Sequence, residues 1–153
     1  MVTEFDWIDI CLRLGAAALA GLIIGFNRDL ADKPIGMRTL GLVALGAAVA
    51  SLATIQFHDL SDHPDALSRV VQGIIQGIMG GISFIGAGVI LRDARAHMVE
   101  GLTTAATVWV TAAFGIACAL AAWRVLLVAT VLTLLLLFAG HVTDALVRKR
   151  RKT

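Results

Sequence analysis

Apolar residues run along this chain in five long segments, separated by short stretches that hold most of the charged and turn-forming residues. No segment alternates apolar and polar residues over about ten positions, as a membrane β-strand does. A helix rises about 1.5 Å per residue, so each segment is long enough to cross a hydrocarbon core of about 30 Å. The pattern predicts one transmembrane domain, residues 1–147, with helices at about 8–26, 38–57, 70–91, 101–121 and 124–146.

The overall composition supports a membrane protein. Of the 153 residues, 58% are hydrophobic and only 16% are charged, and the mean hydropathy is +0.85. A soluble domain of this length has a single core and needs polar faces on its helices, which segments this apolar do not provide. We therefore predict an all-α integral membrane protein.

Basic residues gather on one side of the predicted membrane domain. The loops after the first and third helices, together with the C-terminal tail, hold ten Lys and Arg, against two on the opposite side. Cytoplasmic loops carry such an excess, so the asymmetry predicts an outside N-terminus and a cytoplasmic C-terminus. The basic tail, residues 148–153, is then a topological anchor that can also contact anionic lipid. It lacks a folded basic face with interleaved aromatic residues, so we expect no nucleic-acid partner.

Small residues recur at helical spacing in the first and third predicted helices. Glycines four positions apart let two helices approach closely inside a bilayer. The predicted helix-packing positions are Gly21 and Gly25 in the first helix, and Gly73, Gly77 and Gly81 in the third.

Polar residues form a second stripe in the third and fourth predicted helices. Lipid cannot satisfy their hydrogen bonds, so this stripe should face protein or an aqueous cavity. Two interpretations stay open: a contact surface between helices, or the lining of a path for a cation or small solute. The residues of this polar intramembrane face are Gln72, Gln76, Ser83, Thr107 and Thr111, with Thr104 at its end.

Few residues offer other chemistry within the predicted helices. Asp9 and Arg13 lie four positions apart and are expected to form an ion pair on one helix face. Cys11 and Cys118 both lie near outer helix ends, where a disulfide is conceivable, but small packing residues explain them better. Nothing resembles the spacing of a structural metal site.

An acidic link between the second and third predicted helices, residues 58–69, is a further candidate site. Its carboxylates, Asp59, Asp62 and Asp65, could surround a divalent cation, because such ions prefer oxygen ligands. A solvated external loop explains the same residues without a ligand. We therefore predict no metal and no cofactor.

Three blocks of residues resemble the MgtC/SapB family of bacterial inner-membrane proteins, in the family's order and spacing. They are Gly21-Leu22-Ile23-Ile24-Gly25-Phe26-Asn27-Arg28-Asp29 with Pro34-Ile35-Gly36-Met37-Arg38-Thr39, then Phe84-Ile85-Gly86-Ala87-Gly88-Val89-Ile90, then Gly101-Leu102-Thr103-Thr104-Ala105-Ala106-Thr107-Val108-Trp109. The resemblance implies a five-helix domain in the inner membrane. It also implies a link to growth in low Mg²⁺, to survival inside macrophages and, for one member, to inhibition of the membrane ATP synthase.

The resemblance has two departures. Many relatives carry Glu-Arg-Glu where this chain has Asn27-Arg28-Asp29, so one carboxylate is lost and another is shortened. Longer relatives append a soluble C-terminal α/β domain, whereas this sequence ends at Thr153, as expected for a short, SapB-like form.

The resemblance and the predicted topology together place a group of residues at the cytoplasmic rim as candidates for contacting a partner or ligand. The rim candidates are Arg28, Asp29, Arg38, Thr39, Gly86, Gly88, Gly101, Thr103 and Thr104. Arginines there could hold a carboxylate or an anionic lipid. We expect Asp29 to pair with Arg28 or Arg38, so that Arg38→Ala would destabilise the protein.

The leading functional hypothesis is a non-enzymatic membrane protein that acts by helix-helix contact. Its partner would be a second copy of itself or another membrane complex such as ATP synthase. The alternative is an oligomeric transporter or channel for a cation or small solute. An enzyme is disfavoured, because the sequence lacks a nucleophile elbow, a His-Glu metal motif and a phosphate loop.

Overall fold

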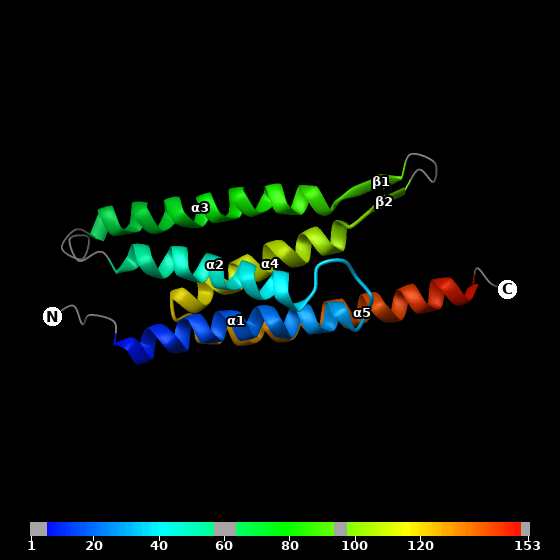
Figure 1. Cartoon of the computed structure of the whole chain (residues 1–153), viewed down its shortest axis with the longest axis horizontal. Coiled ribbons are helices and arrows are strands. Elements are labelled where there is room, and N and C mark those ends of the chain that lie inside the picture. The colour runs from blue at the N-terminus through cyan, green and yellow to red at the C-terminus, as the bar shows by residue number, and fades with distance from the viewer. Residues whose placement is uncertain (1–5, 57–63, 94–97, 151–153) are drawn as a thin grey trace.

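The computed structural model describes residues 6–56, 64–93 and 98–150. Five helices in these ranges are long and apolar enough to cross a membrane, so the predicted all-α membrane class is confirmed. The elements are α1 (Trp7–Asp29), α2 (Met37–Ile55), α3 (Pro64–Val89), β1 (Leu91–Asp93), β2 (Met98–Glu100), α4 (Leu102–Ala119) and α5 (Trp123–Arg150). Figure 1 shows the helices running roughly side by side along the long axis of the molecule.

The two ends of the bundle differ in which connections they carry. The α1–α2 loop, the β1–β2 hairpin and the C-terminal end of α5 lie at one end, while the start of α1 and the α4–α5 turn lie at the other (Figure 1). The first group contains the basic stretches counted in the sequence. We call this end the basic end; that it faces the cytoplasm remains a prediction from charge.

Helices α1, α2 and α4 form the tightly packed part of the bundle. A methyl group added at Gly21 would lie 2.8 Å from the α-carbon of Gly41, and one at Gly25 would lie 2.6 Å from the Met37 nitrogen. One added at Gly115 of α4 would lie 2.9 Å from the β-carbon of Ala47 on α2. Real β-carbons do not approach other atoms this closely, so these three contacts require glycine.

Small side chains fill most of the space between these three helices. Half of the buried hydrophobic residues in the described part of the chain are alanines, and Ile24, Leu40 and Val108 are among the few large side chains that are fully buried. Cys118 is buried in a cluster with Ala17, as expected for a packing residue, whereas the Cys11 thiol is exposed and both cysteines are free.

Hydroxyl groups inside this core are satisfied by their own helices. Thr107 donates to the carbonyl oxygen of Thr103 at 2.7 Å, and Thr111 donates to that of Thr107 at 2.8 Å. On α2, Ser51 donates to the carbonyl of Ala47 at 2.8 Å. Because each hydroxyl finds its acceptor one turn back, these polar residues can be buried without a partner on another helix.

Helices α3 and α5 lie at the periphery. Only 6% of the membrane-spanning window of α3 is buried within the chain, and 0% of that of α5, against 56% for α4. The exposed surface of α5 is leucine-rich, through Leu127, Leu132, Leu135 and Leu136, which suits contact with lipid tails.

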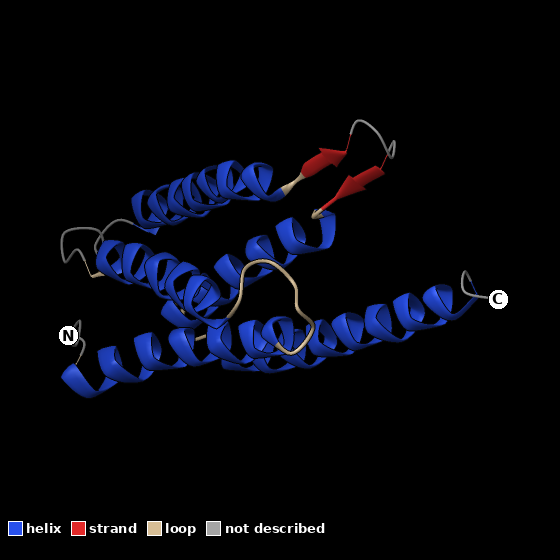
Figure 2. Ribbon diagram, turned by 45° about the vertical axis from the view of Figure 1, so that its right-hand side comes forward, coloured by secondary structure: helices blue, strands red, loops and turns tan. Residues whose placement is uncertain are grey.

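Two connections differ from the predicted ones. Residues 91–100, expected to be a plain link, contain an antiparallel hairpin in which Leu91 pairs with Glu100 (Figure 2). Helix α3 begins at Pro64, not near residue 70, because proline suits the first turn of a helix. Asp65 and Arg69, expected in the acidic link, therefore lie on α3.

Candidate functional site

A buried arginine is the centre of the basic end. Arg28 lies in the last turn of α1 and is 3% exposed. Its Nη2 donates to the carbonyl oxygen of Pro34 at 3.1 Å and to the hydroxyl of Thr104 at the start of α4. Its Nε is buried and has no hydrogen-bond partner in the described part of the chain. The guanidinium thus connects α1, the α1–α2 loop and α4 through neutral acceptors alone.

Asp29 does not pair with a neighbouring arginine, so the expected ion pair is wrong. Its Oδ2 accepts a hydrogen bond from the backbone N–H of Met37 at 3.1 Å. The first N–H groups of a helix have no partner within that helix, so the carboxylate caps α2 and also lies favourably at the positive end of its dipole. Asp29 thus accepts from a backbone donor one loop away, while the side chain of Arg38 is exposed.

The Pro34-Ile35-Gly36 segment is held in one conformation by these contacts. A methyl group at Gly36 would lie 2.7 Å from Oδ2 of Asp29, so glycine makes room for the capping carboxylate. Ile35 adopts a φ of 65°, which is rare for a β-branched residue, and its side chain packs against the cluster around Ile24. Strained backbone of this kind persists only where the surroundings hold it.

The start of α4 depends on a second special glycine. Gly101 has a φ of 87°, and a methyl group there would lie 3.0 Å from the backbone carbon of Val89 at the end of α3. Gly86 is buried against Ala105, with room for a methyl group at 3.6 Å, while Gly88 has no neighbour within 4 Å. Gly101 therefore lets α4 begin directly beside the end of α3.

The remaining rim candidates lie on the surface. Arg38, Thr39 and Thr103 are exposed. Arg38 makes no hydrogen bond or ion pair within residues 6–56, 64–93 and 98–150. The structure thus removes the reason for expecting Arg38→Ala to destabilise the protein, and it assigns that structural role to Arg28.

A second arginine of α1, Arg13, forms a hydrogen bond with the opposite end of α4. The predicted pair on α1 is present, with Arg13 Nε 2.7 Å from Oδ2 of Asp9. Arg13 also donates from Nη1 to the carbonyl oxygen of Ala119 at 2.6 Å, which satisfies an acceptor in the last turn of α4. Two arginines of α1 therefore hold α4, one near each end of the bundle.

The outer face of α3 is the second candidate site. Gln72, Gln76 and Ser83 are all exposed, as are the glycines at 73, 77 and 81, none of which has an atom within 4 Å of where a methyl group would lie. Ser83 donates to the carbonyl of Met79 at 2.9 Å, but neither glutamine amide has a partner in the described part of the chain. The predicted packing glycines at 73, 77 and 81 therefore face no other helix within the described residues.

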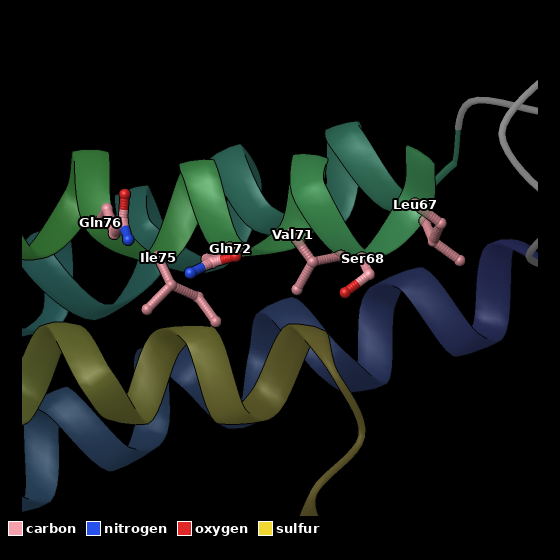
Figure 3. A pocket seen from close by; sticks show the side chains of 6 residues that line it. All are labelled: Leu67, Ser68, Val71, Gln72, Ile75 and Gln76. Atoms are coloured by element: carbon pink, nitrogen blue, oxygen red, sulfur yellow. The ribbon is translucent and has the colours of Figure 1, made fainter. Parts of the chain in front are cut away.

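A groove runs along α3 beside this face, and Val71 and Ile75 in its lining point toward α4 (Figure 3). Figure 3 shows its lining, which comes from α3: Leu67, Ser68, Val71, Gln72, Ile75 and Gln76. Apolar residues alternate along the groove with one hydroxyl and two amides, so it offers both packing surface and hydrogen-bonding groups.

The polar stripes of α3 and α4 do not face each other. Thr104, Thr107 and Thr111 are buried inside the bundle, whereas Gln72 and Gln76 are exposed on its outside. The two sets therefore do not line a shared aqueous path within one chain.

The acidic residues considered for a cation do not form a described site. Asp59 and Asp62 lie outside the described residues, and Asp65 is exposed on α3. Within the described ranges, no group of three or more His, Cys, Asp or Glu side chains could hold a metal ion.

Some residues of the basic end were missed by reasoning from sequence. The Pro34 carbonyl and the Met37 N–H are backbone groups, so no residue type marks them. Gly36 lies directly before α2 and seven positions after Asp29. Because glycine has no side chain with which to cap the helix, this position could have indicated that another residue supplies the cap. Gly115 lies on the threonine stripe of α4 and could have been ranked with the packing glycines.

Comparison with known proteins places these features in a wider group. A family model described as "MgtC family" matches residues 14–146. Protein SrpB of Synechococcus elongatus is 42% identical over 140 residues, which are 86% of this chain and 75% of that protein. No solved structure matches.

Two further relatives are longer than the segment they share with this chain. Protein MgtC of Salmonella typhimurium is 40% identical over 123 residues, 80% of this chain and 48% of its own length. Protein SapB of Bacillus subtilis is 36% identical over 112 residues, 71% of this chain and 47% of its own length. The chain thus spans about half the length of these two relatives.

Proposed function

This chain belongs to the MgtC family, and from that premise we propose that it is a non-enzymatic protein of a bacterial inner membrane that acts by lateral contact between α3 and another transmembrane helix. The family resemblance adds a role in Mg²⁺ homeostasis or virulence. It also makes a membrane complex such as ATP synthase one class of partner for this contact.

The observation that supports this proposal is the exposed outer face of α3. Lipid tails offer no hydrogen bonds to the amides of Gln72 and Gln76, so leaving these groups against lipid costs free energy. A second helix supplies such bonds, and small residues such as Gly80 let its backbone come close. The leucine-rich surface of α5 has neither property.

The rest of the bundle serves to present this face. Arg28 and Arg13 attach α4 to α1 at its two ends, and glycine contacts attach α1 and α4 to α2. Helix α3 packs against α4, where Gly86 meets Ala105, and leaves its opposite side open. A partner can therefore contact α3 without disturbing the core.

Photo-crosslinking in native membranes tests the proposal. A photoreactive side chain is placed at Ser83 on the outer face of α3, and at Leu132 on the exposed surface of α5 as the matched control. We expect a covalent protein adduct from position 83 and only lipid adducts from position 132. Protein adducts in equal yield from both positions, or from neither, would contradict a specific contact through α3.

A further inference from the structure

The outer face of α3 contains a continuous stripe with helical spacing. Its seven members are separated by three or four positions and all are exposed: Asp65, Arg69, Gln72, Gln76, Gly80, Ser83 and Ala87. Alternation of threes and fours is the spacing by which two helices pack side by side at a small crossing angle. We call these residues the α3 seam.

The charged end of the α3 seam has no partner in the described part of the chain. Asp65 and Arg69 are four positions apart on one helix, yet they form no ion pair with each other or with any described residue. Both side chains are exposed. One positive and one negative group thus remain available at the end of α3 opposite the basic end.

These two charges are complementary to a second copy of the same seam. Two copies in one membrane have the same orientation, so a two-fold axis along the membrane normal brings their α3 helices together in parallel. In a pair of parallel helices, a seam residue lies beside the same residue of the partner helix. It also lies near the partner residue that comes four positions later in the sequence. Asp65 of each copy therefore faces Arg69 of the other, which gives two reciprocal ion pairs.

The centre of the seam is also complementary to itself. A glutamine amide has both donors and acceptors, so Gln72 and Gln76 can each bond the same amide across a two-fold axis. Beyond them Gly80, Ser83 and Ala87 are small, which allows the two helix backbones to approach closely. Charges, amides and small residues thus follow one another along the stripe, and a second copy supplies the opposite charge, the amide or the small residue that each of them needs.

We infer that α3 is the contact surface of a parallel, two-fold symmetric homodimer, with Asp65–Arg69 ion pairs at one end and paired amides in its middle. This inference rests on the proposed function, since it names the partner of the proposed α3 contact. A different protein would need the opposite charges at the same height in the membrane, whereas a second copy supplies them necessarily.

Charge exchange between two tagged chains tests the inference. One chain carries Asp65→Arg and the other carries Arg69→Asp, and both carry Gln76→Cys in a background without native thiols, Cys11→Ser and Cys118→Ala. Each altered chain expressed alone should form about three- to tenfold less disulfide-linked dimer in membranes than the chain that keeps Asp65 and Arg69. In each altered chain positions 65 and 69 carry the same charge, so that like charges face each other in its homodimer. Together the two chains should form the mixed dimer in excess over either homodimer.

The outcomes distinguish the inference from the proposal beneath it. Recovery of the mixed dimer supports the homodimer, since a merely structural role of Asp65 or Arg69 would not favour unlike chains. A protein adduct at position 83 to a different protein, with no disulfide at position 76, overturns the homodimer and leaves the proposed α3 contact standing. If neither a protein adduct at position 83 nor a disulfide at position 76 forms, the homodimer and the proposed α3 contact are both overturned. Leu132→Cys on α5 is the matched control and should give no disulfide-linked dimer.

Discussion

Helices α3 and α4 flank the same hairpin and are both rich in small and polar residues, yet their environments are opposite. Thr104, Thr107, Thr111 and Gly115 of α4 are buried inside the bundle, while the glutamines and most glycines of α3 are exposed. The difference follows from the side chains. A threonine hydroxyl is satisfied by its own helix, so α4 can enter a core, whereas a glutamine amide needs a partner from another helix.

The comparison also shows that one residue type has two roles. Gly21 and Gly25 of α1 and Gly115 of α4 are required because the backbone of α2 lies where their side chains would be. In α3 every glycine except Gly86 has open space at that position within the described part of the chain. Small residues at helical spacing therefore indicate a close approach without saying whether the approaching helix belongs to the same molecule.

The largest expected effect is the loss of the α1–α2 contact in Gly21→Ala. The new methyl group meets the backbone of α2, which cannot move away easily, and overpacking of this kind costs about 1–3 kcal/mol or more. Unfolding of the purified protein in detergent micelles measures this loss of unfolding free energy. Gly15→Ala is the matched control on the same helix, since nothing lies within 4 Å of its added methyl group. Equal stability of the two variants would contradict the packing described for α1.

A second prediction contrasts two arginines of the basic end. Arg28→Ala removes the donor to Pro34 and Thr104 and leaves their oxygens unsatisfied, so we expect a loss of about 2–3 kcal/mol in unfolding free energy. Arg38→Ala removes an exposed side chain and should change it by less than about 0.5 kcal/mol. Denaturant titration of both variants checks the contrast, which fails if Arg38→Ala is the more damaging.

A smaller effect is expected at the cap of α2. Asp29→Ala removes the acceptor for the Met37 N–H and should cost about 1 kcal/mol. Gly36→Ala should also destabilise, because its methyl group displaces the same carboxylate. A double-mutant cycle provides the measurement: the cost of Gly36→Ala should fall once Asp29 is already alanine. Additive costs would show that the two residues do not act through one contact.

Several features could be predicted from the sequence because they depend on local patterns. Long apolar segments defined the five helices, and glycine spacing identified the α1 positions that contact α2. The proximity of Arg28 to Thr104 followed from placing both at the basic end. The helices and the α1 glycines needed only length and periodicity, whereas the grouping of Arg28 with Thr104 also used the family resemblance.

Other features could not be predicted, for physical reasons. The stripe containing Gln72 and Gln76 fits a bundle interior as well as an outer face, since both environments favour small polar residues. Asp29 was assigned to an arginine because a sequence shows side-chain charges but not which backbone N–H lies nearby. The β1–β2 hairpin was missed because residues 91–100 are charged and show no strand-like alternation.

The most direct test of the central claim is a measurement of stability and self-association in one variant, Gly80→Leu. Gly80 lies on the outer face of α3 with nothing within 4 Å. Förster transfer between labelled chains in lipid bilayers should show association weakened by about tenfold, because the larger side chain separates the two helices. The unfolding free energy of the monomer in detergent should change by less than about 0.5 kcal/mol. Unchanged association, together with a clear loss of monomer stability, would show that this face belongs to the fold and not to a contact between molecules.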